Sequence, residues 1–156
     1  MDNTLIANAG EFFVCSQLSK KGIITLMTPK NNPLFDIIAT DNLGKSHVVI
    51  QVKTMGINNK QGWKLNKQIT VRKNNPNLFL VLVDLKENEL NDFLVYKYDD
   101  FVDRVNEVYQ DYINKPHYRT GQPKKDVFFR WFDYKDFNEE DNIRKNDWTP
   151  LTAKLM

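Results

Sequence analysis

Cysteine and histidine are scarce in this chain of 156 residues. Cys15 is the only cysteine, so no disulfide can form within one chain, and we expect a reducing compartment, the cytoplasm. The two histidines, His47 and His117, are far apart in the sequence. Together with a single cysteine they exclude a zinc site built from Cys and His ligands.

Long apolar runs are also missing, and none approaches the roughly 20 residues that cross a bilayer. We therefore expect no membrane partner. The N-terminal segment MDNTLIANAGEFF has no basic stretch followed by an apolar one, so we do not expect a signal peptide. Ten Phe, six Tyr and three Trp residues favour a folded globular chain. The length predicts a single domain over residues 1–156.

Acidic residues are absent between Asp41 and Asp84, although the net charge of the chain is only +2. The acid-free window contains seven basic residues: Lys45, Lys53, Lys60, Lys64, Lys67, Arg72 and Lys73. Acids are instead concentrated in residues 133–141. This asymmetry predicts one positively charged face, and the alternative is an ordinary solvated lysine-rich surface.

The most informative stretch is residues 34–54, LFDIIATDNLGKSHVVIQVKT, which we predict to be a β-hairpin. Its two strand-like runs flank a turn centred near Leu43. Folding about this turn brings Asp36 near Gln51 at the open end of the hairpin. Gln51 and Lys53 are two residues apart, so on a strand they point to the same side.

A carboxylate, an amide and an ammonium group are thus predicted to converge. A buried lysine without a partner is costly, so Lys53 requires a reason to be there, unless it simply faces solvent. Carboxylate and amide oxygens can hold a hard cation such as Mg²⁺. A nearby lysine can orient or deprotonate a metal-bound water, and a basic face can hold a phosphate backbone. These groups are the parts needed for phosphodiester hydrolysis.

The rest of the chain alternates between helical and strand-like patterns. Residues 4–21 are predicted to form a helix, and Gly10 inside it suggests that the helix backbone packs closely against another element. Glu11 taken alone is typical of an exposed helix position. The predicted strands are residues 23–28, a doubly buried central strand at 78–85, residues 92–98 and residues 127–132, while residues 63–72 suit either a strand or a short helix.

The C-terminal half is predicted to contain one long helix, capped by Asp99 or Asp100 and ending near residue 115. The tail from Asp133 is expected to be irregular, with Trp148, Pro150 and Leu151 docking on the core. The order of elements predicts an α/β fold with a mixed central β-sheet flanked by helices.

Asp36, the Gln51-Val52-Lys53 run and the upstream Gly10-Glu11 helix together resemble the PD-(D/E)xK nuclease superfamily. The similarity is greatest to its restriction-endonuclease-like and Holliday-junction-resolvase-like branches. The resemblance implies a restriction-endonuclease-like core over about residues 4–85. Residues 86–156 have no counterpart in it and are expected to be a C-terminal elaboration.

The resemblance also implies roles for individual residues. Asp36 would be the metal-binding aspartate, Lys53 the catalytic lysine, Gln51 the replacement for the second acid and Glu11 the helix glutamate. Mg²⁺ or Mn²⁺ is the implied cofactor, DNA the implied partner, and a homodimer a further possibility. The chain departs from the pattern at Phe35, where the family has proline, and at Gln51, whose uncharged amide should weaken Mg²⁺ binding.

Basic and aromatic residues after the hairpin are candidates for binding nucleic acid: Lys60, Trp63, Lys64, Lys67, Arg72 and Lys73. Trp63 is the candidate for stacking on a base or sugar. The alternative is that Trp63 packs on the sheet and the lysines are solvated.

Three functions are compatible with these observations. The first is a metal-dependent nuclease acting on DNA. The second is a nuclease-fold protein that binds nucleic acid or a protein partner without catalysis, which Gln51 favours. The third is a small interaction protein of a defence or toxin operon that docks through an exposed cluster of aromatic residues, unless that cluster is simply core: Phe128, Phe129, Trp131 and Phe132.

Overall fold

The computed structural model describes residues 2–30 and 32–156. The helices are α1 (Asn3–Ser19), α2 (Tyr98–Asn114), α3 (Glu139–Arg144) and α4 (Thr149–Thr152), with two 3-10 helices, η1 (Lys67–Thr70) and η2 (Tyr134–Asp136). The strands are β1 (Ile24–Met27), β2 (Ile37–Thr40), β3 (His47–Met55), β4 (Gly62–Asn66), β5 (Leu78–Asp84), β6 (Asp92–Lys97) and β7 (Phe129–Asp133). Within the described ranges, no helix is both long and apolar enough to cross a bilayer.

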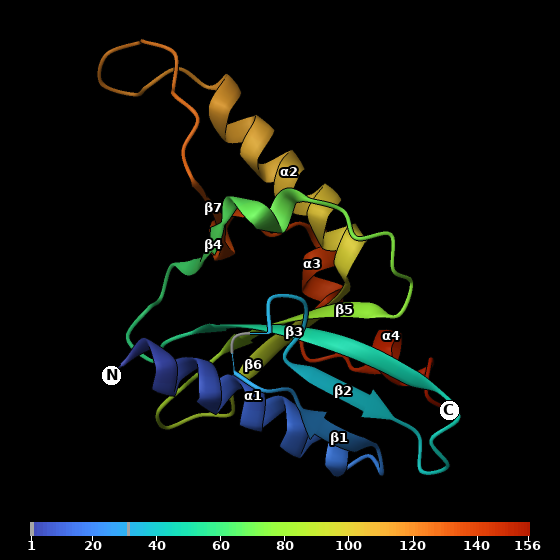
Figure 1. The fold of residues 1–156 in the computed structure, drawn as a ribbon. Helices are drawn as coiled ribbons and strands as arrows, with labels where there is room; N and C mark the ends of the chain where they lie inside the picture. Colours follow the sequence, from blue (N-terminus) through green and yellow to red (C-terminus); the bar gives the residue numbers. More distant parts are fainter. Residues whose placement is uncertain (1, 31) are drawn as a thin grey trace.

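Five strands form the central sheet in the order β1-β2-β3-β5-β6. The strands β1, β2 and β3 are an antiparallel meander, β3 and β5 are parallel, and β5 and β6 are antiparallel. The predicted mixed sheet flanked by helices is therefore confirmed. The strand β7 does not extend this sheet but pairs with β4 in a separate two-stranded ribbon. Figure 1 shows α1 on one side of the central sheet and α2 with the β4–β7 ribbon on the other.

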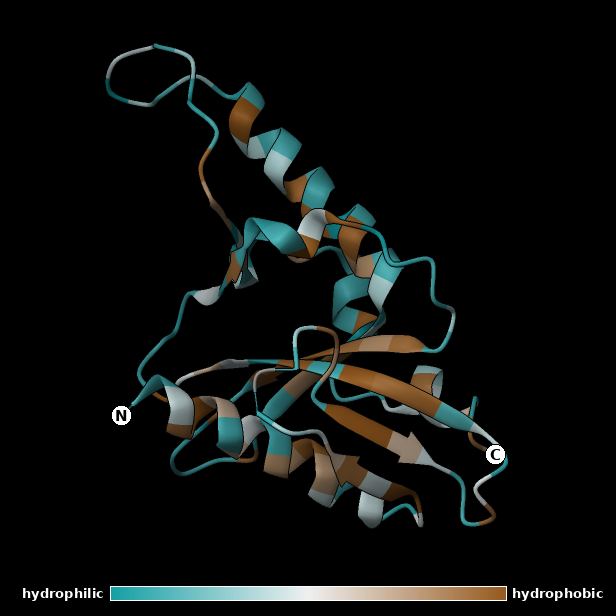
Figure 2. Ribbon diagram, in the orientation of Figure 1, coloured by the Kyte–Doolittle hydropathy of each residue, from teal (hydrophilic) through white to brown (hydrophobic). Residues whose placement is uncertain are grey.

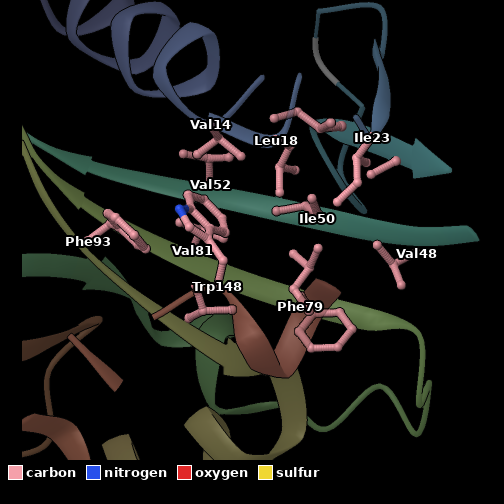
Figure 3. Close-up of a cluster of buried hydrophobic side chains, with 14 of the residues drawn as sticks. Val14, Leu18, Ile23, Val48, Ile50, Val52, Phe79, Val81, Phe93 and Trp148 are labelled. Atoms are coloured by element: carbon pink, nitrogen blue, oxygen red, sulfur yellow. The ribbon is translucent and has the colours of Figure 1, made fainter. Parts of the chain in front are cut away.

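The central strand β5 separates two hydrophobic cores, and all seven of its residues are buried, as predicted. Phe79, Val81 and Val83 face the first core, which includes side chains of α1 (Figure 3). Leu80 and Leu82 face the second core, which includes side chains of α2. Such a strand reads as a continuous apolar run because both its faces are covered, and Figure 2 shows it as a brown stretch.

The C-terminal tail docks on the first core, as predicted. Trp148 stacks on Phe93 with ring centroids 4.3 Å apart, and Leu151 is fully buried. The expectation that the tail is irregular is wrong, since it contains η2, α3 and α4. Asn138 and Asp141 form a capping box that starts α3, each side chain accepting a hydrogen bond from the backbone N–H of the other.

The predicted cap of α2 is also wrong. Lys97 occupies the N-cap position without a side-chain hydrogen bond, while Asp99 and Asp100 lie in the first helical turn. The Asp99 carboxylate accepts hydrogen bonds from the backbone N–H groups of Lys73 and Asn74 instead. Acids in the first turn still favour the helix through its dipole, and Asp99 also holds the segment before β5.

The segment 63–72, whose sequence suited either a strand or a short helix, contains a strand followed by a short helix. Its first part lies in β4 and its second part forms η1, where the Asn66 side chain accepts a hydrogen bond from the Gln68 N–H. The predicted first strand of the hairpin is shorter than expected. It begins only at Ile37, so Asp36 stands just before β2.

Candidate active site

Asp36 lies where β2 and β3 separate. Ile37, the first residue of β2, pairs with Ile50 at the end of the β2–β3 ladder. Beyond that pair, β3 continues beside β5 as far as Met55. The Asp36 N–H donates to the Ile50 carbonyl at 2.8 Å, and the Val52 N–H donates to Asp36 Oδ2 at 2.7 Å. The carboxylate is thereby fixed at the edge of β3 next to Gln51, as the hairpin geometry predicts.

Gln51 and Lys53 lie on the same side of β3, and both are half-buried. Ile50 and Val52, which alternate with them, point into the first core. Val49 points to the same side as Gln51 and packs against the second core. A strand with period two therefore presents the amide and the ammonium group together, at the stretch of β3 that reaches beyond β2.

Glu11 lies on α1 and is half-buried. Burial, and after it the negative charge of Asp36, raises the pKa of the Glu11 carboxyl, while the positive charges of Lys30 and Lys53 act in the opposite direction. The Glu11 carboxyl is therefore near enough to Asp36, Lys30 and Lys53 for their charges to act on it. Lys30 was not a candidate from the sequence, and its only signal there was a cation in the connection leading to Asp36.

The raised pKa of Glu11 predicts a pH dependence of stability in metal-free buffer. A carboxyl with a raised folded-state pKa favours folding below its ordinary pKa of 4.5. That contribution is lost as the pH rises through the raised value. We expect the free energy of unfolding of the wild type to fall relative to that of Glu11→Gln over this interval. Urea unfolding of both proteins across the interval measures this, and a difference that does not change with pH would contradict it.

Gly10 explains how α1 comes close enough to place Glu11. A Cβ atom at Gly10 would lie 1.9 Å from Thr54 Oγ1, so the helix backbone packs directly on β3. This confirms the close packing that a glycine inside a helix predicted. Thr54 Oγ1 is buried and has no hydrogen-bond partner among the described residues, which suits a side chain that serves as a packing surface.

The contact between Gly10 and Thr54 predicts that Gly10→Ala destabilises the protein. Alanine in a helix interior normally stabilises by about 1 kcal/mol relative to glycine. Overpacking of this kind typically costs about 1–3 kcal/mol, so we expect a net loss. Combining it with Thr54→Ala removes the closest atom and should restore part of the loss. Urea unfolding tests this, with Ser16→Ala on the exposed side of α1 as the control. Equal stability of Gly10→Ala and this control would contradict the prediction.

The chemical types of the donor atoms here are those that hard divalent cations prefer. Glu11 and Asp36 would supply carboxylates and Gln51 an amide oxygen, and the bond from Val52 occupies only one oxygen of Asp36. Oxygen ligands suit Mg²⁺ or Mn²⁺. The described residues contain no group of three or more His, Cys, Asp or Glu side chains arranged as a metal site. With two carboxylates and one amide, the affinity is expected to be modest.

The basic window does not form one continuous positive face. Lys67 forms an ion pair with Asp126, and Arg72 forms one with Asp103. Lys64 is exposed and lies over the Phe129 ring, 4.3 Å from its centroid. Two of the six proposed nucleic-acid-binding residues are thus paired with acids, which come from sequence positions after residue 100. Lys60 and Lys73 are exposed.

Trp63 cannot have the stacking role that the sequence allowed. It is 2% exposed, and its indole Nε1–H donates to the Val83 carbonyl at 3.2 Å. Its ring contacts Tyr134 within the second core. The alternative, that Trp63 packs on the sheet, is the correct one.

The aromatic cluster near the C-terminus is divided between core and surface. Phe132 is fully buried, whereas Phe128 is 86% exposed. Phe129 and Trp131 are half-buried on β7. The cluster is therefore neither entirely core nor entirely surface, and Phe132 is its fully buried member.

The comparisons with known proteins concern the fold. No family model matches the chain, and no curated protein matches it. The structure is similar to that of Hjc, a Holliday junction resolvase from the archaeal hyperthermophile Archaeoglobus fulgidus. The TM-score is 0.53 at 12% identity, over 96% of this chain and 98% of that one. It is also similar to the bacterial homing endonuclease I-Ssp6803I, with a TM-score of 0.49 at 20% identity, over 66% of this chain and 74% of that one.

The match to the resolvase structure covers nearly the whole chain, so it extends well beyond the predicted core of residues 4–85. At 12% identity, the similarity to the resolvase structure establishes the fold alone. The chain therefore has the restriction-endonuclease-like fold of this resolvase, which is the fold implied by the resemblance of its hairpin motif.

Proposed function

We propose that this protein is a divalent-metal-dependent nuclease that hydrolyses phosphodiester bonds in DNA. The observation that supports this most is the position of Asp36. The Val52 N–H group holds the Asp36 carboxylate just before β2, beside Gln51. Burial and the negative charge of Asp36 raise the pKa of Glu11, and the positive charge of Lys53 acts to lower it. These groups gather on a fold shared with nucleases.

In this proposal Asp36 and Gln51 hold the cation, and Glu11 adds a second carboxylate at its side. A bound Mg²⁺ or Mn²⁺ would supply an activated water and neutralise charge on the phosphate. Lys53 lies beside the donors, where its ammonium group can orient the attacking water or stabilise the developing negative charge. Its position on β3 is held by the strand pairing with β5, opposite Leu82.

The DNA backbone would contact the basic side chains that are not engaged in ion pairs. Lys60, Lys64 and Lys73 are the members of the basic window that suit this role, because Lys67 and Arg72 already have carboxylate partners. The neighbour from Archaeoglobus fulgidus is a Holliday junction resolvase. A four-way junction is therefore one substrate to compare with linear duplex DNA.

The test is a cleavage assay with the purified protein on labelled linear duplex and four-way junction DNA. We expect cleavage of at least one substrate in Mg²⁺ or Mn²⁺ and none in EDTA. Cleavage that persists in EDTA, or no cleavage of either substrate with either metal, would refute the proposal.

A second candidate is a protein of the same fold that binds DNA without cutting it. Gln51 favours it, since an amide contributes no charge to cation binding and the site then has two carboxylates at most. The two candidates differ in metal binding. A saturable Mn²⁺ site that is lost in Asp36→Asn supports the nuclease, while DNA binding without any Mn²⁺ site supports the second candidate.

A further inference from the structure

A cavity of about 880 Å³ lies beside β7, away from the charged groups around Asp36. Its walls come from the second half of α2, the following connection, β7 and η2, with Gln61 from the segment before β4. Figure 1 shows α2 and the β4–β7 ribbon together on one side of the central sheet. Neither the fold comparison nor the proposed catalytic groups account for this cavity.

Aromatic rings form much of its lining: Tyr109, Tyr112, Phe129 and Trp131. Tyr109 and Tyr112 lie with their centroids 6.2 Å apart, and Phe129 and Trp131 project from the same side of β7. Lys64 lies over this side, 5.9 Å from the Trp131 centroid, and Lys124 lies 3.8 Å from the Tyr112 centroid. Proteins that bind unpaired nucleotides typically stack the bases on aromatic side chains and contact the phosphate backbone with basic side chains.

The lining charges favour a flat neutral group over a free phosphate. Four basic and four acidic side chains line the cavity, so their formal charges cancel. A phosphate would find no net attraction inside it. A nucleobase carries no charge and has a polar edge, while its phosphate can remain outside near Lys64.

One polar group in the wall lacks a partner. Asp133 is 3% exposed; its Oδ2 accepts a hydrogen bond from Gln61 Nε2 and lies 3.4 Å from Lys135 Nζ. Its Oδ1 is buried, lies 3.0 Å from where a Cβ atom at Gly62 would stand, and has no hydrogen-bond partner among the described residues, so the carboxylate has to turn toward the cavity to meet a ligand. A buried carboxylate oxygen without a donor is costly. The amino groups of cytosine and adenine are donors that suit a carboxylate, whereas an unpaired thymine has no amino group and offers only its ring N3–H.

We propose that this cavity binds an unpaired nucleobase of DNA, by stacking on the β7 rings and by an amino-group hydrogen bond to Asp133. This rests on the proposed function and assigns it a substrate class, DNA with an unpaired or displaced nucleotide. Gln61 follows Lys53 by eight residues, so the Cα atom of Gln61 in the cavity wall lies at most about 29 Å from that of the proposed catalytic lysine. At about 3.4 Å per base pair of duplex DNA, that distance is at most about eight base pairs.

The test measures binding in EDTA, so that it does not depend on cleavage. The probes are a short paired duplex and the same duplex with one bulged cytosine, one bulged thymine or one bulged abasic site. We expect the wild type to bind the cytosine bulge at least about fivefold more tightly than the paired duplex or the abasic bulge, as one base–aromatic stack would give. Cytosine should also be favoured over thymine.

Variants assign this preference to the cavity. Trp131→Ala should remove the preference for the bulge, Trp131→Phe should keep most of it, and Asp133→Ala should remove the preference for cytosine over thymine. Tyr112→Ala, at a residue 52% exposed, gives a second test if Trp131→Ala does not fold. Phe128→Ala is the matched control, since Phe128 is 86% exposed and lies outside the described lining.

The outcomes separate this inference from the nuclease proposal. Equal binding of paired and bulged probes, or a preference unchanged in both Trp131→Ala and Tyr112→Ala, overturns the cavity inference and leaves the cleavage result untouched. Loss of cleavage in metal with the bulge preference intact overturns only the nuclease proposal. A preference for the bulge that depends on Trp131 supports the inference.

Discussion

Asp36→Asn and Lys53→Met are each expected to abolish metal-dependent DNA cleavage while the protein stays folded. Asparagine keeps an oxygen that can accept the Val52 N–H bond, so the fork between β2 and β3 is preserved, but it loses the charge that holds the cation. Methionine keeps much of the apolar stem of lysine and removes its ammonium group. A positioned acid–base group contributes about 10²- to 10⁴-fold, so we expect a rate loss in this range for Lys53→Met and at least as large a loss for Asp36→Asn, which removes a ligand of the cation.

Initial cleavage rates in Mn²⁺ measure the effect, and urea unfolding in EDTA confirms that each variant is folded. Lys45→Ala is the matched control, because Lys45 is an exposed lysine in the turn at the opposite end of the same hairpin. Wild-type rates in both site variants would show that the catalytic groups lie elsewhere. An equal loss in Lys45→Ala would indicate a general loss of DNA binding instead.

Gln51→Glu is expected to tighten Mn²⁺ binding by at least about tenfold. A carboxylate beside Asp36 adds a negative charge next to the cation, and near a protein surface one pair of unit charges about 4 Å apart is worth roughly 4 kcal/mol. Solvent and the neighbouring Lys53 reduce this, and each tenfold in affinity corresponds to about 1.4 kcal/mol. Titration calorimetry with Mn²⁺ measures the change.

The same substitution should have the opposite effect on stability when no metal is present. Glu11, Asp36 and a glutamate at position 51 would repel one another, so the free energy of unfolding in EDTA should fall and should recover in Mn²⁺. Gln110→Glu, at an exposed position on α2, controls for the added charge. Unchanged Mn²⁺ affinity in Gln51→Glu would place residue 51 outside the cation site.

The arrangement around the hairpin could be predicted because its determinants are local. The turn near Leu43 sets the register, and the register alone decides that Asp36 meets Gln51 and which side Lys53 takes. The alternation of side chains along a strand then places Gln51 and Lys53 on the same side of β3. Gly10 was informative for a similar reason, since a glycine inside a helix has few explanations other than close packing.

The basic residues after the hairpin were harder to interpret, because their partners are distant in the sequence. Arg72 meets Asp103 on α2, and Lys67 meets Asp126 before β7. Trp63 is buried because β4 pairs with β7 and closes the second core over it. Pairing between strands more than 60 residues apart leaves no signal in local patterns.

The tail was misjudged for a different reason. Asn138 followed three residues later by Asp141 is a variant of the capping-box pattern with aspartate at its third helical position. Its acidic composition suggested an irregular segment, but acids in the first turn of α3 stabilise a helix N-terminus. Asp141 is in addition fully buried, where Tyr96 and Arg104 donate hydrogen bonds to its carboxylate.

Direct measurement of Mn²⁺ binding tests most sharply whether Glu11, Asp36 and Gln51 form a cation site at the fork of β2 and β3. Calorimetric titration of the wild type should give one saturable site, absent in Asp36→Asn and retained in Lys45→Ala. A wild type without a saturable site, or one that Asp36→Asn leaves unchanged, would contradict the proposed metal centre and with it the assignment of these residues to phosphodiester hydrolysis.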